Sequence, residues 1–428
     1  MAKTLPMIAN FDDIPAEALV PAAEQPYKIP AHWKWVWFGS VANFIGGGTP
    51  DKSVSSFWDG EILWASVKDL RHPRITRTID TITEEGLANS ATSLCDVGDL
   101  VLATRIMPGK SAIATVPIAI NQDLKIVKTQ LLVPEYLQYY LDSQTCWFES
   151  NSSGSTVKGI RISSLASLPV PLAPLDVQHG IVRRVEQANA KIDDVIERLR
   201  QHLEQAPNLR AKFIQAGVAG RLTPSWRREQ NLSGGSWRRT TVGELGTVVT
   251  GNTPPTKVKE NYGDFLPFIK PADLNQGRRI NLADSSLSET GAKLARVVPP
   301  GSVAMCCIGA TITKAGLIDV EAATNQQINV LVPSTDHDSV FLFYLFESPQ
   351  FKHEVIASSS STTLPIINKG RFSKLEVEVP ELLEQQEIAR ILDKALGEFD
   401  QTVELIESTI AKLLLLRSHY VLSALAGN

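Results

Sequence analysis

Two long segments of the chain place apolar residues at helical spacing, and each follows a region of short apolar runs. The first segment covers about 176–206 and the second about 383–424. In both, apolar positions recur at intervals of 4, 3, 4, 3 and 4 residues, which predicts helices that pack along their length. The two stripes are Ile181, Val185, Ala188, Ile192, Val195 and Leu199, and Ile388, Leu392, Ala395, Phe399, Thr402 and Ile406.

We interpret these stripes as the contact surface of an intramolecular antiparallel coiled coil, because both copies keep the same spacing for about three heptads. The alternative is that each amphipathic helix lies on its own domain. Thr402 would be a polar position in the contact surface, which fixes register at some cost in stability. The residues expected to pair the helices and dock partners are Ile181, Val185, Ile192, Leu199, Ile388, Leu392, Phe399 and Ile406.

The regions before the helices, about 34–172 and 238–380, consist of short β-type runs separated by Gly, Pro, Asn and Asp. They also match each other. Thr49-Pro50 falls on Thr253-Pro254, 204 residues later, and the same offset relates further positions. These are Gly39 and Gly243, Trp58 and Tyr262, Asp69-Leu70 and Asp273-Leu274, Lys110 and Lys314, and Asn121-Gln122 and Asn325-Gln326. In the helices the offset becomes 207, so the chain is an internal pseudo-repeat of about 204–207 residues.

The repeat predicts a mixed α+β chain in which two globular domains alternate with two long helices. Pro207 is expected to end or kink the first helix, with Asn208 capping a shorter helix that Gly220 closes. The expected boundaries are an N-terminal arm at 1–30, a first domain at 31–175, a central helical region at 176–222, a linker at 223–237, a second domain at 238–381 and a C-terminal helical region at 382–428.

Composition fits a folded protein of two or three domains rather than a polycation. The chain has 428 residues, 43% of them hydrophobic, and a formal net charge of −4. A local basic surface on such a chain still permits DNA binding. The four cysteines form no C-x-x-C pair, so we expect no structural zinc. Because no signal peptide or long apolar run is present, we expect a cytoplasmic protein with no membrane contact.

The familiar catalytic motifs are missing. The chain has no P-loop, no G-x-G-x-x-G, no G-x-S-x-G and no H-E-x-x-H. The tetrapeptide that begins at Thr253 lacks the aromatic residue with which amino-methyltransferases stack a flipped base. We therefore expect no catalytic residue, metal or cofactor in this chain.

Several features favour nucleic-acid binding. Hydroxyl-rich segments that end in basic residues occupy 151–161 and 358–371, and lysines recur in the glycine-rich loops at 107–112 and 309–316. Hydroxyl, amide, Lys and Arg groups contact phosphates and base edges, although each of these segments is also consistent with an ordinary surface loop. Asn121-Gln122 and Asn325-Gln326 are candidates for reading adenine, but we favour a role in satisfying backbone groups at a strand start. The candidate DNA-binding residues are Thr49, Lys68, Arg71, Arg74, Arg105, Lys110, Ser155, Thr156, Lys158, Arg161, Thr253, Lys257, Lys270, Arg278, Arg279, Lys314, Thr362, Asn368 and Lys369.

This organisation resembles the DNA-specificity subunits of type I restriction-modification enzymes, from about Tyr27 to Asn428. The matching landmarks in the first copy are Trp35 with Gly39, 48–50, 69–70, 97–99, 153–156, 168–171 and 209–222. In the second copy they are 251–254, 273–274, 358–363, 379–380 and 384–389. One departure is 176–181, a looser form of the pattern at 384–388.

The resemblance implies that each variable domain is a target-recognition domain that reads one half of a split DNA site. It implies that the helices act as a spacer, with about 30 residues spanning roughly 45 Å, and bind two methylation subunits that recruit restriction subunits. S-adenosylmethionine, Mg²⁺ and ATP would act on those partners. A type IIB specificity subunit, a coiled-coil scaffold and a self-contained enzyme with unfamiliar motifs remain the alternatives.

Overall fold

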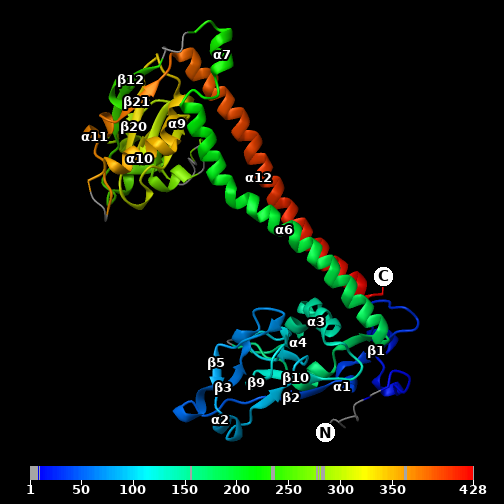
Figure 1. Cartoon of the computed structure of the whole chain (residues 1–428). Coiled ribbons are helices and arrows are strands. Elements are labelled where there is room, and N and C mark those ends of the chain that lie inside the picture. The colour runs from blue at the N-terminus through cyan, green and yellow to red at the C-terminus, as the bar shows by residue number, and fades with distance from the viewer. Residues whose placement is uncertain are drawn as a thin grey trace. The chain divides into compact units, whose positions relative to one another are not determined.

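The chain forms two compact units, each built from one α+β domain and parts of two long helices. The computed structural model describes residues 8, 10–154, 157–232, 237–275, 278, 280, 285–360 and 364–427. The first unit comprises Met1–Arg198 and Thr409–Asn428, and the second comprises Leu199–Ser408. The long helices are α6 (Leu175–Val218) and α12 (Leu382–Leu425), so each helix contributes one part to each unit (Figure 1).

The first domain contains three small sheets with short helices at their edges. Its strands are β1 (Lys34–Trp37), β2 (Asn43–Gly46), β3 (Trp58–Ala65), β4 (Arg74–Ile75), β5 (Asp80–Ile82), β6 (Ser93–Cys95), β7 (Leu100–Ala103), β8 (Ser111–Ala114), β9 (Ile118–Ile120), β10 (Leu124–Lys128) and β11 (Pro169–Leu172). Its helices are α1 (Phe38–Val41), α2 (Glu84–Ala88), α3 (Pro134–Ser143), α4 (Thr145–Asn151) and α5 (Ile162–Ala166). The sheet orders are β2-β10-β7-β8-β4, β5-β3-β9-β6 and β1-β11.

The second domain repeats this plan. Its strands are β12 (Arg238–Thr241), β13 (Gly246–Thr250), β14 (Tyr262–Ile269), β15 (Ser286–Leu287), β16 (Val297–Val298), β17 (Ser302–Cys306), β18 (Ala315–Ile318), β19 (Ala322–Thr324), β20 (Ile328–Pro333) and β21 (Glu376–Val379). Its helices are α8 (Glu289–Ala292), α9 (Ser339–Glu347), α10 (Pro349–Ala357) and α11 (Lys369–Ser373). The orders β13-β20-β17-β18, β15-β14-β19-β16 and β12-β21 match those of the first domain except for the edge strand β4, which confirms the internal repeat.

Successive side chains of the central strands belong to two different hydrophobic layers in each domain. In β7, Leu100 and Leu102 belong to one core cluster, whereas Val101 and Ala103 belong to another. Successive side chains of a strand point to opposite faces, so a strand buried on both faces is apolar throughout. The same split occurs in β17, where Val303 and Met305 face one cluster and Ala304 and Cys306 the other.

Each long helix is fastened to its own domain by one buried glutamine in its first turn. In α6, the Gln178 amide accepts from the Val133 N–H at 2.8 Å and donates to the carbonyls of Leu131 and Ala173, both at 2.8 Å. In α12, Gln385 occupies the equivalent place, accepts from the Asp338 N–H and donates to the Pro380 carbonyl. The two glutamines are 207 residues apart, so this anchor is part of the repeat.

Within each unit, α6 and α12 lie side by side and antiparallel (Figure 1). In the first unit, Arg417 of α12 pairs with Asp193 of α6 at 2.9 Å. In the second unit, Arg210 pairs with Asp400 at 2.5 Å, and the Gly217 backbone packs directly against the Leu392 side chain. The helices therefore pair as the sequence predicts, while their first turns also lie on their own domains.

The contact surface of the helix pair differs from the predicted stripe near the middle of both helices. Ile196 is only 3% exposed, whereas the predicted Val195 is 42% exposed. Between residues 190 and 210, the less exposed positions of α6 are 192, 196, 199, 203, 206 and 210, which again follow a heptad spacing. Thr402 was expected in the surface and is exposed instead; its hydroxyl donates to the Glu398 carbonyl at 2.8 Å, while Val403 is half-buried.

The predicted pairing residues divide into two groups by what they contact. Ile181 and Val185 pack in the core of the first domain, and Ile388 and Leu392 in that of the second. The others, half-buried along the helices, are Ile192, Leu199, Phe399 and Ile406.

Pro207 neither ends nor breaks the first helix, contrary to expectation, because α6 runs unbroken through it. Proline removes one backbone hydrogen bond in a helix interior. Here Pro207 is exposed while the neighbouring Ala206 is buried, so packing on that face keeps the helix intact. The expected ending is confirmed: Gly220 has φ +68°, and the Arg221 N–H donates to the Ala216 carbonyl at 2.9 Å.

The segments expected to be an N-terminal arm and a linker pack against the domains where the structure describes them. Val20 lies in the first domain's core, and Ile8, Phe11 and Ile14 pack against it. Residues 224–229 form helix α7 (Pro224–Glu229), beside which buried Glu384 accepts one hydrogen bond from the Thr223 hydroxyl and pairs with Arg227 at 3.2 Å.

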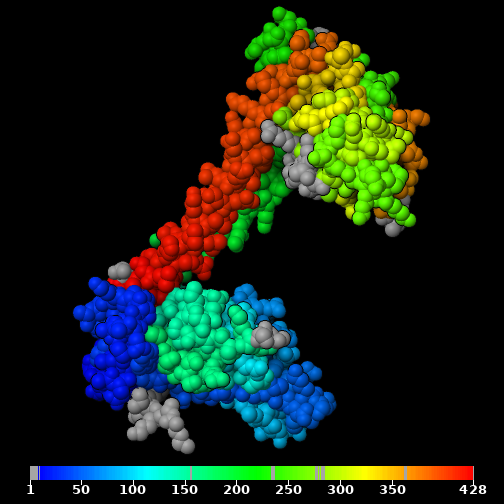
Figure 2. Space-filling model, turned by 180° about the vertical axis from the view of Figure 1, so that it is seen from behind, coloured from blue at the N-terminus to red at the C-terminus, as the bar shows by residue number. Residues whose placement is uncertain are grey.

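The end of α12 completes the first domain. Ala424 and Leu425 are buried in the first domain's core, and Gly427 lies against Pro30. Figure 2 shows this contact as the red end of α12 on the blue N-terminal segment.

Candidate nucleic-acid interface

Each domain joins its lysine loop to its hydroxyl-rich segment in a short two-stranded ribbon. In the first domain, residues 104–106 pair with 158–160: the Ile160 N–H donates to the Thr104 carbonyl and the Ile106 N–H to the Lys158 carbonyl, both at 2.8 Å. In the second domain, the Ile367 N–H donates to the Cys307 carbonyl at 3.0 Å and the Gly309 N–H to the Pro365 carbonyl at 2.9 Å. Segments about 50 residues apart in the sequence therefore meet at one place in both domains.

The lysine loops are closed by corresponding backbone hydrogen bonds in both copies, although the second loop is one residue longer. The Gly109 N–H donates to the Ala103 carbonyl and the Lys110 N–H to the Met107 carbonyl. The equivalent bonds run from Thr313 to Cys306 and from Lys314 to Thr311. Each loop has two residues with positive φ, Ile106 (+68°) and Gly109 (+93°) in the first domain and Gly309 (+84°) and Thr313 (+74°) in the second.

The asparagine–glutamine pairs hold the turn beside the ribbon, which is the structural role that we favoured for them. Asn121 is buried, and its side-chain oxygen accepts from the Asp123 N–H at 3.0 Å. Asn325 accepts in the same way from the Gln327 N–H at 3.0 Å. Gln122 accepts a hydrogen bond from the Thr49 hydroxyl, and Gln326 accepts one from the Thr253 hydroxyl. The G-T-P turn is thereby tied to the ribbon in each domain.

Basic candidates separate into exposed cations and arginines held by carboxylates of the same unit. The exposed ones are Lys68, Arg71, Lys158, Arg161, Lys257, Lys270 and Lys369. Arg74 pairs with Glu135 at 3.4 Å and with Glu186 of α6 at 3.7 Å. Arg105 pairs with Asp123 at 3.1 Å, and Arg278 pairs with Asp393 of α12. These three arginines form ion pairs within their own unit, which the sequence pattern did not indicate.

The remaining candidates have mixed surroundings. Lys110 and Lys314 are half-buried. Burial raises the pKa of Asp142, and the Lys110 ammonium opposes that rise, so the lysine lies within electrostatic reach of a carboxylate. Asn368 caps α11 by accepting from the Arg371 N–H at 2.9 Å. Ser155, Thr156, Arg279 and Thr362 lie outside the described residues.

Apolar residues that the sequence reasoning passed over project from the first ribbon. Ile106 is 55% exposed and Met107 is 51% exposed. Val157 and Ile162, on the other side of the ribbon, are also exposed. In the sequence, Ile106 and Met107 stand only as two residues at a turn after an apolar strand. Many loop residues occupy such a position, so the sequence did not indicate that these two are exposed.

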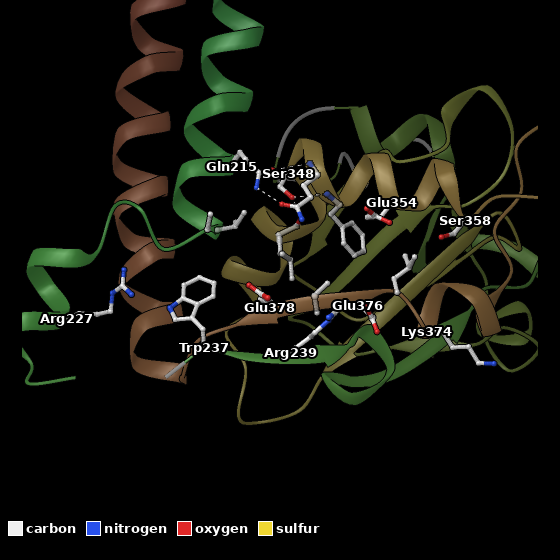
Figure 3. Close-up of a pocket in the computed structure, with 17 residues that line it drawn as sticks. Gln215, Arg227, Trp237, Arg239, Ser348, Glu354, Ser358, Lys374, Glu376 and Glu378 are labelled. Atoms are coloured by element: carbon white, nitrogen blue, oxygen red, sulfur yellow. Dashed lines mark hydrogen bonds and ion pairs between the residues drawn. The ribbon is translucent and has the colours of Figure 1, made fainter. Parts of the chain in front are cut away.

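The cleft in Figure 3 does not fit a phosphate backbone. It has a volume of about 820 Å³ and lies in the second unit, between the end of α6 and the β12–β21 pair. Glu354, Glu376 and Glu378 line it, and Arg239 is already paired with Glu376. Arg227 and Lys374 line it too, so three carboxylates face three cations and the cleft offers no net positive charge to a phosphate backbone.

The described residues also bear on metal binding and on membrane insertion. Among the described residues, no group of three or more His, Cys, Asp or Glu side chains could hold a metal ion. In the same part of the chain, no helix is both long enough and apolar enough to cross a membrane.

Most of the chain matches one family of known proteins. The family model of the type I restriction modification DNA specificity domain matches twice, at residues 30–205 and 235–415. The chain is 31% identical over 179 residues to the type I restriction enzyme HindI specificity subunit of Haemophilus influenzae, and 26% identical over 181 residues to the EcoR124I/EcoR124II specificity subunit of Escherichia coli. Each alignment covers 40% of this chain, and they cover 39% and 44% of those relatives, less than half of their length.

The fold agrees with a solved structure over nearly the full length. The HsdS subunit from Thermoanaerobacter tengcongensis superposes with a TM-score of 0.62 at 20% identity, covering 95% of this chain and 99% of that one. The duplicated sheets, the paired long helices and the two matches of the family model converge on one conclusion. This chain belongs to the family of type I restriction modification DNA specificity domains and carries that domain twice.

Proposed function

We propose that this protein is the DNA sequence-recognition subunit of a type I restriction-modification complex. The observation that carries the proposal is the repeated ribbon, which in both copies of the specificity domain joins a lysine loop to a hydroxyl-rich segment. Exposed cations adjoin both ribbons: Lys158 and Arg161 in the first domain and Lys369 in the second. Such groups contact phosphates and position a protein on the duplex, and a two-stranded β-ribbon is one of the elements that a major groove admits.

Each domain, 31–175 and 238–381, reads one half of a bipartite site, and the two read different sequences because their loops differ. The helices set the spacing between the half-sites. Their 44 residues correspond to about 66 Å of helix, longer than the roughly 45 Å expected from sequence, because Pro207 does not end α6. The exposed faces of the helices dock two methylation subunits, through which restriction subunits join the complex.

Those partner subunits carry out the methylation and the DNA cleavage. S-adenosylmethionine serves the methylation subunits, ATP and Mg²⁺ serve the restriction subunits, and this chain contributes no catalytic residue. Methylation of adenine then requires the target base to be flipped out of the duplex into the partner's pocket. The complex acts on DNA in the cytoplasm.

The test is to sequence adenine methylation in host DNA with and without the gene. Loss of one split motif on deletion supports the proposal. Replacing residues 31–175 by the corresponding domain of a relative is then expected to change one half of the motif and leave the other unchanged. An unchanged methylome, together with a purified chain that binds neither DNA nor a methylation subunit, refutes it in favour of a coiled-coil scaffold. A methylation subunit that also cleaves DNA indicates a type IIB system.

A further inference from the structure

The ribbon of the first domain carries an exposed apolar tip that its counterpart lacks. Ile106 and Met107 project from the loop side, and Val157 projects from the other strand. The hydrogen-bond pattern matches Ile106 with Gly309, and Met107 with the neighbourhood of Ala310 and Thr311. Val157 matches Leu364, which is also exposed. At this place the first domain therefore has three large apolar residues, and the second domain has one, Leu364.

Ile106 is kept in a conformation that isoleucine rarely adopts. Its φ is +68°, and Gly309 has φ +84° at the equivalent position. A β-branched residue in this region is an outlier, and glycine adopts it freely. The second domain shows that the loop closes with glycine at this position. Isoleucine is therefore not needed to form the loop, and its side chain, more than half exposed, does not fill a core.

The tip has a backbone hydrogen bond at its base and lies next to positive charge. The Met107 N–H donates to the Arg105 carbonyl at 2.7 Å, and Arg105 itself is fixed by its ion pair with Asp123. Lys158, whose carbonyl accepts from the Ile106 N–H, is exposed. An apolar tip beside exposed cations is complementary to a groove of DNA, in which phosphates flank the base edges.

We propose that Ile106 and Met107 are specificity-determining residues that pack on the C5-methyl group of a thymine in the half-site read by the first domain. This inference rests on the proposed function. Both side chains lack hydrogen-bonding groups suited to base edges, and the thymine methyl is the apolar feature that a base pair presents in the major groove. The second domain, with glycine at the position of Ile106, lacks that part of the contact.

The test measures how the complete complex with its methylation subunits binds duplexes in which each thymine of the first half-site is replaced by uracil, one at a time. Uracil lacks only the methyl group. The wild-type complex is expected to bind one such duplex about fourfold more weakly, the effect of one buried methyl. Uracil in the second half-site serves as the control for the position of the change.

Two variants assign the effect to the tip. Ile106→Gly installs the residue that the second domain already uses, and is expected to leave the thermal midpoint of the protein at or above that of the wild type. Ile106→Gly and Met107→Ala are each expected to reduce the discrimination between thymine and uracil. Val97→Ala changes an equally exposed apolar residue flanked by Asp96 and Asp99, and is expected to keep the full discrimination.

Three results overturn the inference: a first half-site without thymine on either strand, equal binding of all uracil duplexes by the wild type, or undiminished discrimination by both variants. A duplex with a scrambled first half-site separates this failure from failure of the proposed function. If the wild type binds the scrambled duplex as tightly as the specific one, the first domain reads no sequence and the proposed function itself fails.

Discussion

Replacing Gln178 by leucine is expected to loosen α6 from the first domain. The side chain is fully buried and forms three hydrogen bonds of 2.8 Å, all with backbone groups of the same unit. Leucine has a similar size and no polar atoms. The Val133 N–H and the carbonyls of Leu131 and Ala173 thus lose this partner without a large cavity being formed.

The magnitude follows from those three groups. A buried backbone group left without its hydrogen bond costs about 1–3 kcal/mol, and the apolar replacement recovers part of that through packing. We therefore expect the free energy of unfolding of the first unit to fall by about 3–5 kcal/mol. Domains are stable by about 5–15 kcal/mol, and for a unit of this size the thermal midpoint shifts by about 2–4 °C per kcal/mol. The expected decrease is about 6–20 °C.

Tryptophan fluorescence during urea unfolding measures this effect with little contribution from the second unit. Six of the eight tryptophans belong to the first unit: Trp33, Trp35, Trp37, Trp58, Trp64 and Trp147. Gln187→Leu is the matched control, because Gln187 is exposed on the same helix and should change stability by less than about 0.5 kcal/mol. If Gln178→Leu unfolds at the same urea concentration as Gln187→Leu, the anchor carries no stability and the reasoning is refuted.

Three further predictions test the helix contact, the ribbon and the second domain. Ile196→Asp buries a charge and should destabilise the first unit by more than about 3 kcal/mol, whereas Val195→Asp should cost less than about 1 kcal/mol; the opposite order in urea unfolding would restore the contact surface inferred from sequence. Lys110→Ala should weaken DNA binding modestly and equally for all sequences, with the slope of log affinity against log salt smaller by about one; an unchanged slope means that Lys110 touches no phosphate. Burial and the Arg238 guanidinium lower the pKa of His337, so its stabilising contribution is complete above the usual imidazole pKa of 6.5 and declines as the pH falls below it. The second unit should therefore unfold at lower urea concentration at pH 5.5 than at pH 7.5, and His337→Asn should reduce that difference; an equal pH dependence in the variant would show that another group titrates.

The repeat explains how much of the site the sequence predicted. The offsets of 204 and 207 residues placed Thr49 with Thr253 and Lys110 with Lys314, and each pair does occupy equivalent places beside the ribbons. The same comparison of the two copies could have identified the buried glutamines, Gln178 and Gln385. The segment 176–181 was described as a looser form of 384–388, yet the glutamine at the 207-residue offset is the residue that both copies keep.

Other parts of the site were not predictable, because exposure and pairing depend on segments that meet only in space. From the sequence, Arg74 and Arg278 were interpreted as basic residues available to DNA. In the structure they form ion pairs with carboxylates of α6 and α12. Ile106 read as an ordinary loop residue, and only the backbone angle and its exposure single it out.

By itself, the sequence determined that two copies of one α+β domain alternate with two long amphipathic helices, because strand and helix periodicities are local properties that the repeat doubles. Tertiary structure decided which face of each helix is buried. Near its middle, α6 offers both Val195 and Ile196 as apolar candidates, and its pattern alone fits either. Packing against α12 buries Ile196 and leaves Val195 in solvent, since a helix can present only one stripe to an antiparallel neighbour.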